Sequence, residues 1–109
     1  MQFDILTLFP GLFSGVFAES IVRRAIEAGL ISIMIHNIRD YAEGRHSMTD
    51  DAPYGGGGGM VMKPEPIFGA VEHVLALQGP KSVAEASVRV ILLSPQGRPL
   101  TQQMACELS

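Results

Sequence analysis

The sequence has one cysteine, no tryptophan and no excess of positive charge. Its 109 residues include only Cys106, and eight lysines and arginines stand against eleven aspartates and glutamates, for a net charge of −3. A single cysteine excludes an intramolecular disulfide and a multi-cysteine zinc site, and it fits a reducing compartment such as the cytoplasm. The negative charge provides no overall field that attracts nucleic acid. Any contact with RNA must therefore be local.

Long apolar runs and targeting signals are also missing. No stretch approaches the roughly eighteen apolar residues of a membrane span, and Met1–Asp4 lacks the basic flank of a signal peptide. Hydrophobic residues make up 47% of the chain and charged residues 17%, which excludes the composition of a disordered protein. We expect a soluble, cytoplasmic protein of one small domain with no membrane contact.

Hydrophobic patterning predicts alternating strands and helices. An apolar run over residues 3–9 and a period of two over residues 31–38 predict two strands. Helical spacing between residues 12 and 28 predicts one or two helices that end at Gly29, since glycine adopts the left-handed conformation without strain. Another helix is expected over residues 64–78, opened by proline.

The last part of the sequence predicts a third strand and a further helix. Residues 88–93 are β-branched and nearly all apolar, which is typical of a strand covered on both faces. Leu100, Met104 and Leu108 begin a helical stripe. Three strands alternating with helices predict an α/β fold, a three-layer parallel sheet with helices on both faces.

Residues 39–62 show no hydrophobic period and form a long connection for a compact domain, which indicates a functional or a disordered segment. They include five consecutive glycines, Gly55–Gly59. A phosphate loop needs Gly-Lys followed by Ser or Thr, but the nearest lysine, Lys63, is followed by Pro64. A phosphate-binding hydrolase is therefore disfavoured, and a flexible hinge or lid remains an alternative.

The same segment holds most of the reactive side chains: Arg39, Asp40, Arg45, His46, Asp50, Asp51 and Tyr54. Arginine pairs with phosphate, and a carboxylate accepts a proton from a nucleobase or holds a cation. Histidine exchanges protons near neutrality, and tyrosine stacks on a nucleobase. A solvated polar loop would contain the same residue types, so both interpretations stay open. The spacing matches no metal-ligand pattern, so no metal site is predicted, and we interpret His36 and His73 as structural or surface residues.

A short turn sequence, Ser94–Gly97, follows the predicted strand over residues 88–93. Open α/β sheets bind ligands beyond the carboxyl ends of their strands, which favours a functional role. An ordinary tight turn would contain the same proline and glycine.

Together these motifs resemble the bacterial tRNA (guanine-N1)-methyltransferase family. The resemblance rests on Leu8-Phe9-Pro10, Arg39-Asp40, Arg45-His46, the string DDAPYGGGGGM over residues 50–60, and LSPQGR over residues 93–98. The motifs occur in the family's order and span nearly the whole chain. One departure is Gly58, where many relatives are expected to carry proline, and glycine is expected to loosen the loop.

The resemblance implies a knotted SPOUT methyltransferase fold that forms a homodimer. Its members transfer a methyl group from S-adenosylmethionine to N1 of the guanosine immediately 3′ of the tRNA anticodon. The residues that the resemblance places beside the methyl donor are Leu92, Leu93, Ser94, Pro95 and Gln96. Those that it places on the guanine and tRNA side are Arg45, His46, Asp50, Asp51 and Tyr54.

The reaction requires a base, because guanine N1 carries a proton at neutral pH. The base and arginine proposed for the family come from its C-terminal half, so Asp50 is expected at most to assist. We expect residues 1–109 to be the N-terminal portion of the SPOUT domain, truncated before the trefoil knot and the C-terminal domain, and inactive alone. The alternative is a non-catalytic nucleoside- or RNA-binding or assembly module.

Overall fold

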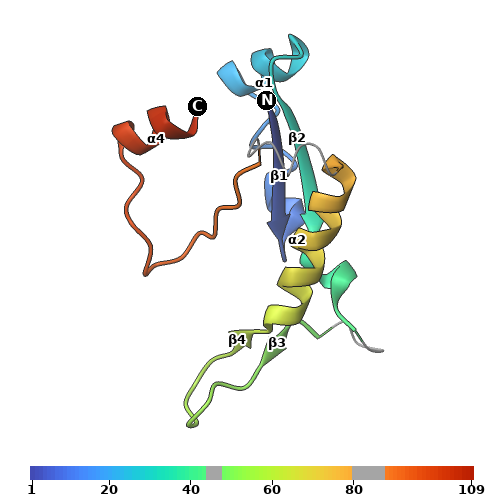
Figure 1. Cartoon of the computed structure of the whole chain (residues 1–109), viewed down its shortest axis with the longest axis vertical. Helices are drawn as coiled ribbons and strands as arrows, with labels where there is room; N and C mark the ends of the chain where they lie inside the picture. Colours follow the sequence, from blue (N-terminus) through green and yellow to red (C-terminus); the bar gives the residue numbers. More distant parts are fainter. Residues whose placement is uncertain (44–47, 80–87) are drawn as a thin grey trace.

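The computed structural model describes residues 1–43, 48–79 and 88–109. Its elements, shown in Figure 1, are strand β1 (Gln2–Thr7), the 3-10 turn η1 (Pro10–Phe13), helix α1 (Ser20–Glu27), strand β2 (Ser32–Asn37), the 3-10 turn η2 (Ile38–Tyr41), strands β3 (Asp50–Asp51) and β4 (Val61–Met62), and helices α2 (Pro64–Gln78) and α4 (Gln102–Leu108). The predicted α/β class is confirmed.

The centre of the fold is a parallel pair of strands, β1 and β2. Phe3 lies beside Ile33 and Ile5 beside Ile35, so apolar side chains line one face of the pair. Both predicted strands form, but β2 ends at Asn37 because the Asn37 side chain accepts a hydrogen bond from the Arg39 backbone N–H at 3.1 Å. This cap starts η2 and turns the chain out of the sheet.

The predicted end of the first helix is confirmed at Gly29. The Gly29 N–H bonds the Ile26 carbonyl and the Leu30 N–H bonds the Ala25 carbonyl, each at 2.9 Å. Gly29 has a φ of +68°, so it supplies the left-handed residue of a Schellman cap. Only residues 20–27 of the predicted region are α-helical, and Pro10 begins η1 near its start.

Helix α2 forms where predicted and supplies most of the core. It runs beside the β1–β2 pair in Figure 1 and contacts both η2 and β1. Among the described residues, the buried hydrophobic side chains are Ile38 from η2 and Ala70 and Val74 from α2. Tyr41 and His73 add a ring contact with centroids 5.4 Å apart. The core therefore lies between α2 and η2.

The predicted third strand is wrong for this structure. Residues 88–93 form no strand, and over residues 90–93 the exposure ranges from 58% at Ile91 to 90% at Leu93. Arg89 donates to the Glu107 carbonyl, so this segment contacts α4 instead of joining the sheet. A strand requires a neighbouring backbone as well as β-branched side chains, and none of the described residues pairs with this segment. The three-layer, three-stranded sheet is thus reduced here to two parallel strands.

The long connection over residues 39–62 is only partly irregular. It contains η2 and a small antiparallel pair, β3 and β4, which the absence of a hydrophobic period could not predict. Two-residue strands are too short to produce a periodic pattern. Residues 80–87, between α2 and the predicted third strand, lie outside the described residues.

Candidate functional site

The most prominent feature of the loop region is an arm formed by residues 50–62, which we call the glycine arm. Asp50 pairs with Met62 and Asp51 with Val61, and the chain between them extends away from the amino end of α2 (Figure 1). Gly55, Gly56, Gly57 and Gly59 have positive φ values between +72° and +145°. Residues with a Cβ are strained in this region, so the loop requires glycine at these positions.

Gly58 differs from its neighbours in the glycine run. It has no positive φ, and a Cβ built on it would meet nothing within 4 Å. Gly58 is therefore the one position of the run whose backbone does not require glycine.

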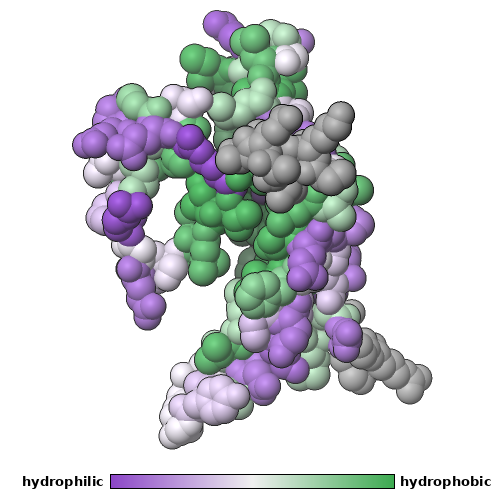
Figure 2. All heavy atoms as spheres, in the orientation of Figure 1, coloured by the Kyte–Doolittle hydropathy of each residue, from purple (hydrophilic) through white to green (hydrophobic). Residues whose placement is uncertain are grey.

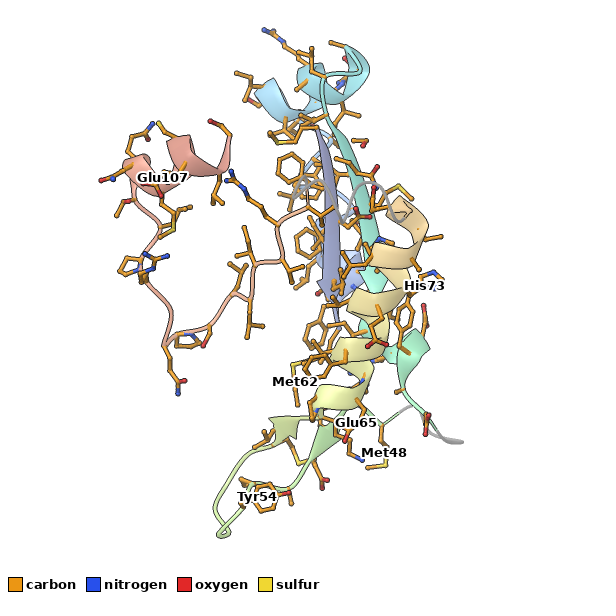
Figure 3. All side chains as sticks on the ribbon, viewed as in Figure 1. Met48, Tyr54, Met62, Glu65, His73 and Glu107 are labelled. Carbon is orange, nitrogen blue, oxygen red and sulfur yellow. The ribbon has the colours of Figure 1, made fainter. Side chains whose placement is uncertain are left out.

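Asp51 and Tyr54 line one open groove of about 700 Å³ at the junction of the glycine arm and α2. Its lining residues are Glu43, Met48, Asp51, Ala52, Tyr54, Val61, Met62, Lys63, Pro64, Glu65 and Pro66. Figure 3 shows Met48, Met62 and Glu65 where the arm joins α2, and Tyr54 further out on the arm. The structure thus brings together two of the predicted guanine-side residues.

The groove is acidic and partly apolar. Glu43, Asp51 and Glu65 contribute three carboxylates against the single ammonium of Lys63. Carboxylates accept hydrogen bonds from N–H groups, and apolar side chains offer packing surface to a flat ring. The groove is suited to a planar group that carries N–H donors and is unsuited to a bare phosphate.

The predicted guanine-side residues differ in their burial and contacts. Asp50 is half-buried in β3 and does not line the groove. Asp51 accepts a hydrogen bond from the Ala52 N–H at 2.8 Å, and Tyr54 is fully exposed. Arg45 and His46 lie outside the described residues.

The predicted donor-side residues form a turn on a separate segment. The Gly97 N–H bonds the Ser94 carbonyl at 2.9 Å, and the Gln96 N–H bonds Ser94 Oγ at 3.3 Å. The turn itself was predicted correctly, but it does not follow a strand, because residues 88–93 are not paired. None of Leu92, Leu93, Ser94, Pro95 and Gln96 lines the groove.

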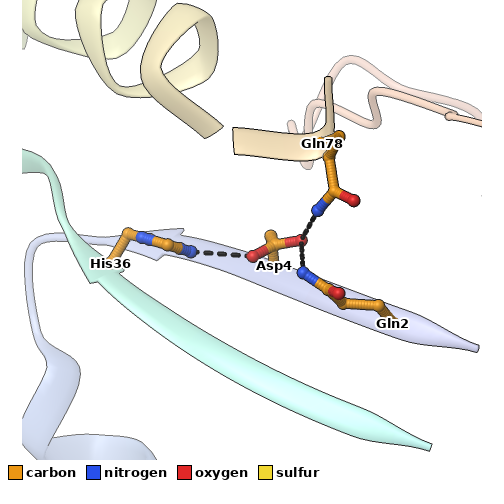
Figure 4. Close-up of polar contacts among 4 residues, drawn as sticks. All are labelled: Gln2, Asp4, His36 and Gln78. Atoms are coloured by element: carbon orange, nitrogen blue, oxygen red, sulfur yellow. Dashed lines mark hydrogen bonds and ion pairs between the residues drawn. The ribbon is translucent and has the colours of Figure 1, made fainter. Parts of the chain in front are cut away.

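A polar cluster on the β1–β2 pair explains His36. Its Nε2 lies 2.8 Å from Asp4 Oδ1, and Gln2 and Gln78 donate to Asp4 Oδ2 at 2.9 and 3.1 Å (Figure 4). Asp4 and His36 are only 16% and 14% exposed. The cluster connects both strands to the end of α2, which confirms a structural role for His36.

Thr49, at the base of the glycine arm, was missed by sequence reasoning. It is 1% exposed and is the buried polar residue of the described chain. Its hydroxyl accepts from Arg39 Nη1 at 3.4 Å, and its carbonyl accepts from the Lys63 N–H at 2.8 Å. The only sequence signal was its position directly before Asp50.

Across residues 1–43, 48–79 and 88–109, no three histidine, cysteine, aspartate or glutamate side chains converge on a metal position. No helix in these ranges is long and apolar enough to cross a membrane.

The chain is similar to known proteins along its whole length. It is 56% identical over all 109 residues to a tRNA (guanine-N(1)-)-methyltransferase of Geobacter sp. (strain M21), of which it covers 41%, and 51% identical to one of Geobacillus kaustophilus, of which it covers 42%. The crystal structure of the tRNA (m1G37) methyltransferase from Aquifex aeolicus superposes with a TM-score of 0.81 at 33% identity, covering 99% of this chain and 45% of that one. The chain therefore spans less than half the length of these relatives.

The family model described as tRNA (Guanine-1)-methyltransferase TrmD matches residues 1–109, with the DDAPYGGGGGM string in the glycine arm and LSPQGR at the turn. The superposition with the Aquifex enzyme supports the same assignment on the α/β fold. This chain belongs to the tRNA (guanine-1)-methyltransferase family.

Proposed function

We propose that the chain is part of an enzyme that methylates N1 of guanine in tRNA with S-adenosylmethionine as methyl donor. The observation that carries the proposal is the family match over all 109 residues. The relatives named for this reaction are more than twice as long as the chain, so it supplies only part of their machinery.

The glycine arm is proposed to bind the target nucleoside and the surrounding RNA. Guanine presents N–H donors on its Watson–Crick edge, which match the carboxylate oxygen of Asp51 in the groove. Tyr54 is exposed for stacking on a base. Asp50 supports this side of the site from β3, and Arg45 and His46 belong to the same segment.

The turn formed by Ser94, Pro95 and Gln96, with Leu92 and Leu93 before it, is proposed to hold the methyl donor. The exposed side chains of Leu92 and Leu93, at 78% and 90%, offer apolar surface that suits a flat adenine ring. When bound, S-adenosylmethionine would supply an electrophilic methyl group. Ser94 closes the turn by bonding the Gln96 N–H and thereby sets its shape.

This chain is proposed to carry only part of the methyl-transfer reaction. The N1 proton of guanine must leave before or during methyl transfer. The resemblance places the base for that step in the half of the relatives that the chain does not cover. Asp50 is proposed to assist by accepting a hydrogen bond, and the chain alone is proposed to bind without turning over.

The complete fold, the oligomeric state and the cellular location of the enzyme are proposed from the family resemblance. We propose that the enzyme completes its sheet and trefoil knot with further chain, that it works as a homodimer, and that it acts in the cytoplasm, where tRNA is modified. Residues 1–109 would then be the N-terminal portion of the SPOUT domain.

The experiment compares Asp50→Ala with Gln96→Ala in the 109-residue chain. An anticodon stem-loop RNA with guanosine 3′ of the anticodon and S-adenosylmethionine are titrated separately by calorimetry. Asp50→Ala should weaken RNA binding by roughly 1.5 to 3 kcal/mol, the value of a charge-assisted hydrogen bond, without changing donor binding. Gln96→Ala should weaken donor binding alone.

Two outcomes would oppose the proposal. The reverse pattern would place the glycine arm in the donor site, and binding of neither probe by the wild-type chain would remove the support for both roles. Methyl incorporation into tRNA by the purified chain would overturn the assignment of the base elsewhere and make Asp50 or Asp51 its leading candidate.

A further inference from the structure

The buried contact at the base of the glycine arm joins Arg39, which belongs to one of the family motifs, to Thr49, which belongs to none of them. Thr49 is almost completely buried, whereas Asp51 and Tyr54 beyond it are exposed. Within a few residues the chain changes from a buried, hydrogen-bonded position to solvent-exposed positions. Thr49 is therefore the point at which the arm is attached to the body.

Thr49 holds three parts of the chain together. Its hydroxyl accepts a hydrogen bond from Arg39 Nη1 in η2, and its carbonyl accepts from the N–H of Lys63, the N-cap residue of α2. Thr49 itself leads directly into β3. The contacts fix the start of the arm to η2 and join it to Lys63, where the arm ends and α2 begins.

The arm has few internal constraints that could orient it instead. Strands β3 and β4 have two residues each, and the turn beyond them is closed by a Gly56 N–H to Pro53 carbonyl bond of 3.4 Å. Glycine backbones lose more freedom on ordering than other residues do. The direction of the arm thus depends mainly on its attachment.

We propose that Arg39 and Thr49 are positioning residues, which hold the glycine arm at the angle in which Asp51 and Tyr54 meet the RNA. They act through the arm and need no contact with RNA. The binding consequence rests on the proposed function, whereas the attachment itself does not. Asn37 supports the arrangement by capping the Arg39 backbone at the start of η2.

The test uses Thr49→Val, which removes the hydroxyl at nearly constant shape, and Thr49→Ser, which keeps it. Arg39→Gln removes the guanidinium, and with it the Nη1 donor and its charge, from a half-buried position on the other side of the contact. Thr101→Val is the matched control, because the Thr101 hydroxyl also accepts one hydrogen bond, from the Met104 N–H, but at the start of α4.

Two readouts separate attachment from function. Hydrogen exchange of the Lys63 amide and the β3–β4 amides should become about tenfold faster in Thr49→Val, as expected for loss of one hydrogen bond to a charged group. Binding of the fluorescent anticodon stem-loop, measured by anisotropy, should weaken about tenfold as well. In Thr49→Ser, which keeps the hydroxyl, the amide exchange rates and the RNA affinity should stay within about twofold of wild type.

The double variant Arg39→Gln, Thr49→Val should be no weaker in RNA binding than either single variant, because both remove the same contact. Additive losses of RNA affinity in the double variant would overturn the Arg39–Thr49 contact. An unchanged rate of amide hydrogen exchange in Thr49→Val would overturn it as well. Faster exchange with unchanged RNA binding would overturn the positioning role. If the wild-type chain binds no RNA, the proposed function fails, and the exchange results alone support or overturn the attachment.

Discussion

Tyr54 and Asp4 show how differently single residues are used in this chain. Tyr54 is fully exposed on the glycine arm, where it contributes nothing to the core. Asp4 is 16% exposed and accepts hydrogen bonds from two strands and a helix. Substitution of the first should therefore affect binding, and substitution of the second should affect folding.

Tyr54→Ala should leave the free energy of unfolding within about 0.5 kcal/mol of wild type, because the side chain is exposed. It should weaken binding of the anticodon stem-loop by about 1 to 3 kcal/mol, the value of stacking one base on an aromatic ring. Tyr54→Phe keeps the ring and should bind like wild type. Urea unfolding and fluorescence anisotropy measure the two effects, and equal binding by the alanine variant would refute stacking at this residue.

Asp4→Ala should lower the free energy of unfolding by about 1 to 3 kcal/mol, since it removes a part-buried acceptor shared by His36, Gln2 and Gln78. The measurement is urea unfolding followed by circular dichroism. Asp40→Ala, at an exposed carboxylate in η2, is the control and should change stability little. Equal effects of the two substitutions would show that the cluster does not stabilise the sheet.

At the scale of elements, the ends of helices and strands are determined by local contacts. Gly29 ends α1 through a Schellman cap, and Asn37 ends β2 by capping η2. The N-cap of α4 is Thr101, whose hydroxyl accepts from the Met104 N–H at 3.2 Å. Each of these contacts lies within five residues in the sequence, so each can form before the tertiary structure does.

Gly29→Ala should destabilise the chain by about 1 to 2 kcal/mol, the cost of placing a Cβ in the left-handed conformation. Space is not the reason, because a Cβ at Gly29 would meet nothing within 4 Å. Gly15→Ala is the matched control, with the same free space and no positive φ. Thermal unfolding distinguishes them, and a neutral Gly29→Ala would show that the cap adds little to stability.

At the scale of the whole molecule, the described chain leaves much apolar surface uncovered. Its radius of gyration is 16.3 Å, compared with about 13 Å expected for a compact domain of this length. Leu12, Ile21 and Leu92 are each at least 70% exposed. Figure 2 shows hydrophobic side chains gathered across the middle of the molecule, whereas the end of the glycine arm is pale to hydrophilic.

The isolated chain is therefore expected to self-associate, because uncovered apolar surface of this kind acquires partners. Sedimentation velocity over a range of concentrations should show a rising average mass, accompanied by binding of a hydrophobic dye. Leu92→Ser with Leu93→Ser should reduce both signals, whereas Gln103→Ser, an exposed polar substitution in α4, should not. A monomer that excludes the dye at all concentrations would contradict the expectation.

Local sequence patterns were sufficient for the elements that depend on neighbours in the chain. Residues 64–78 form the predicted helix, because proline at its start and apolar residues at helical spacing act within a few turns. Gly29 and Ser94–Gly97 likewise adopt the predicted cap and turn. The family motifs identified the glycine arm and the turn as the two segments of interest, because such strings are read without knowing the fold.

Only the tertiary structure determined strand pairing and burial, because these depend on contacts between residues far apart in the sequence. The apolar run 88–93 has the composition of a buried strand, yet it remains unpaired, because pairing requires a neighbouring backbone that composition cannot reveal. The short β3–β4 pair and the burial of Thr49 against Arg39 depend on how the chain returns to η2 and α2. The sequence alone determined the family motifs and the residues predicted to form a site. Only the folded chain determined which of these residues share a groove and where the glycine arm is attached.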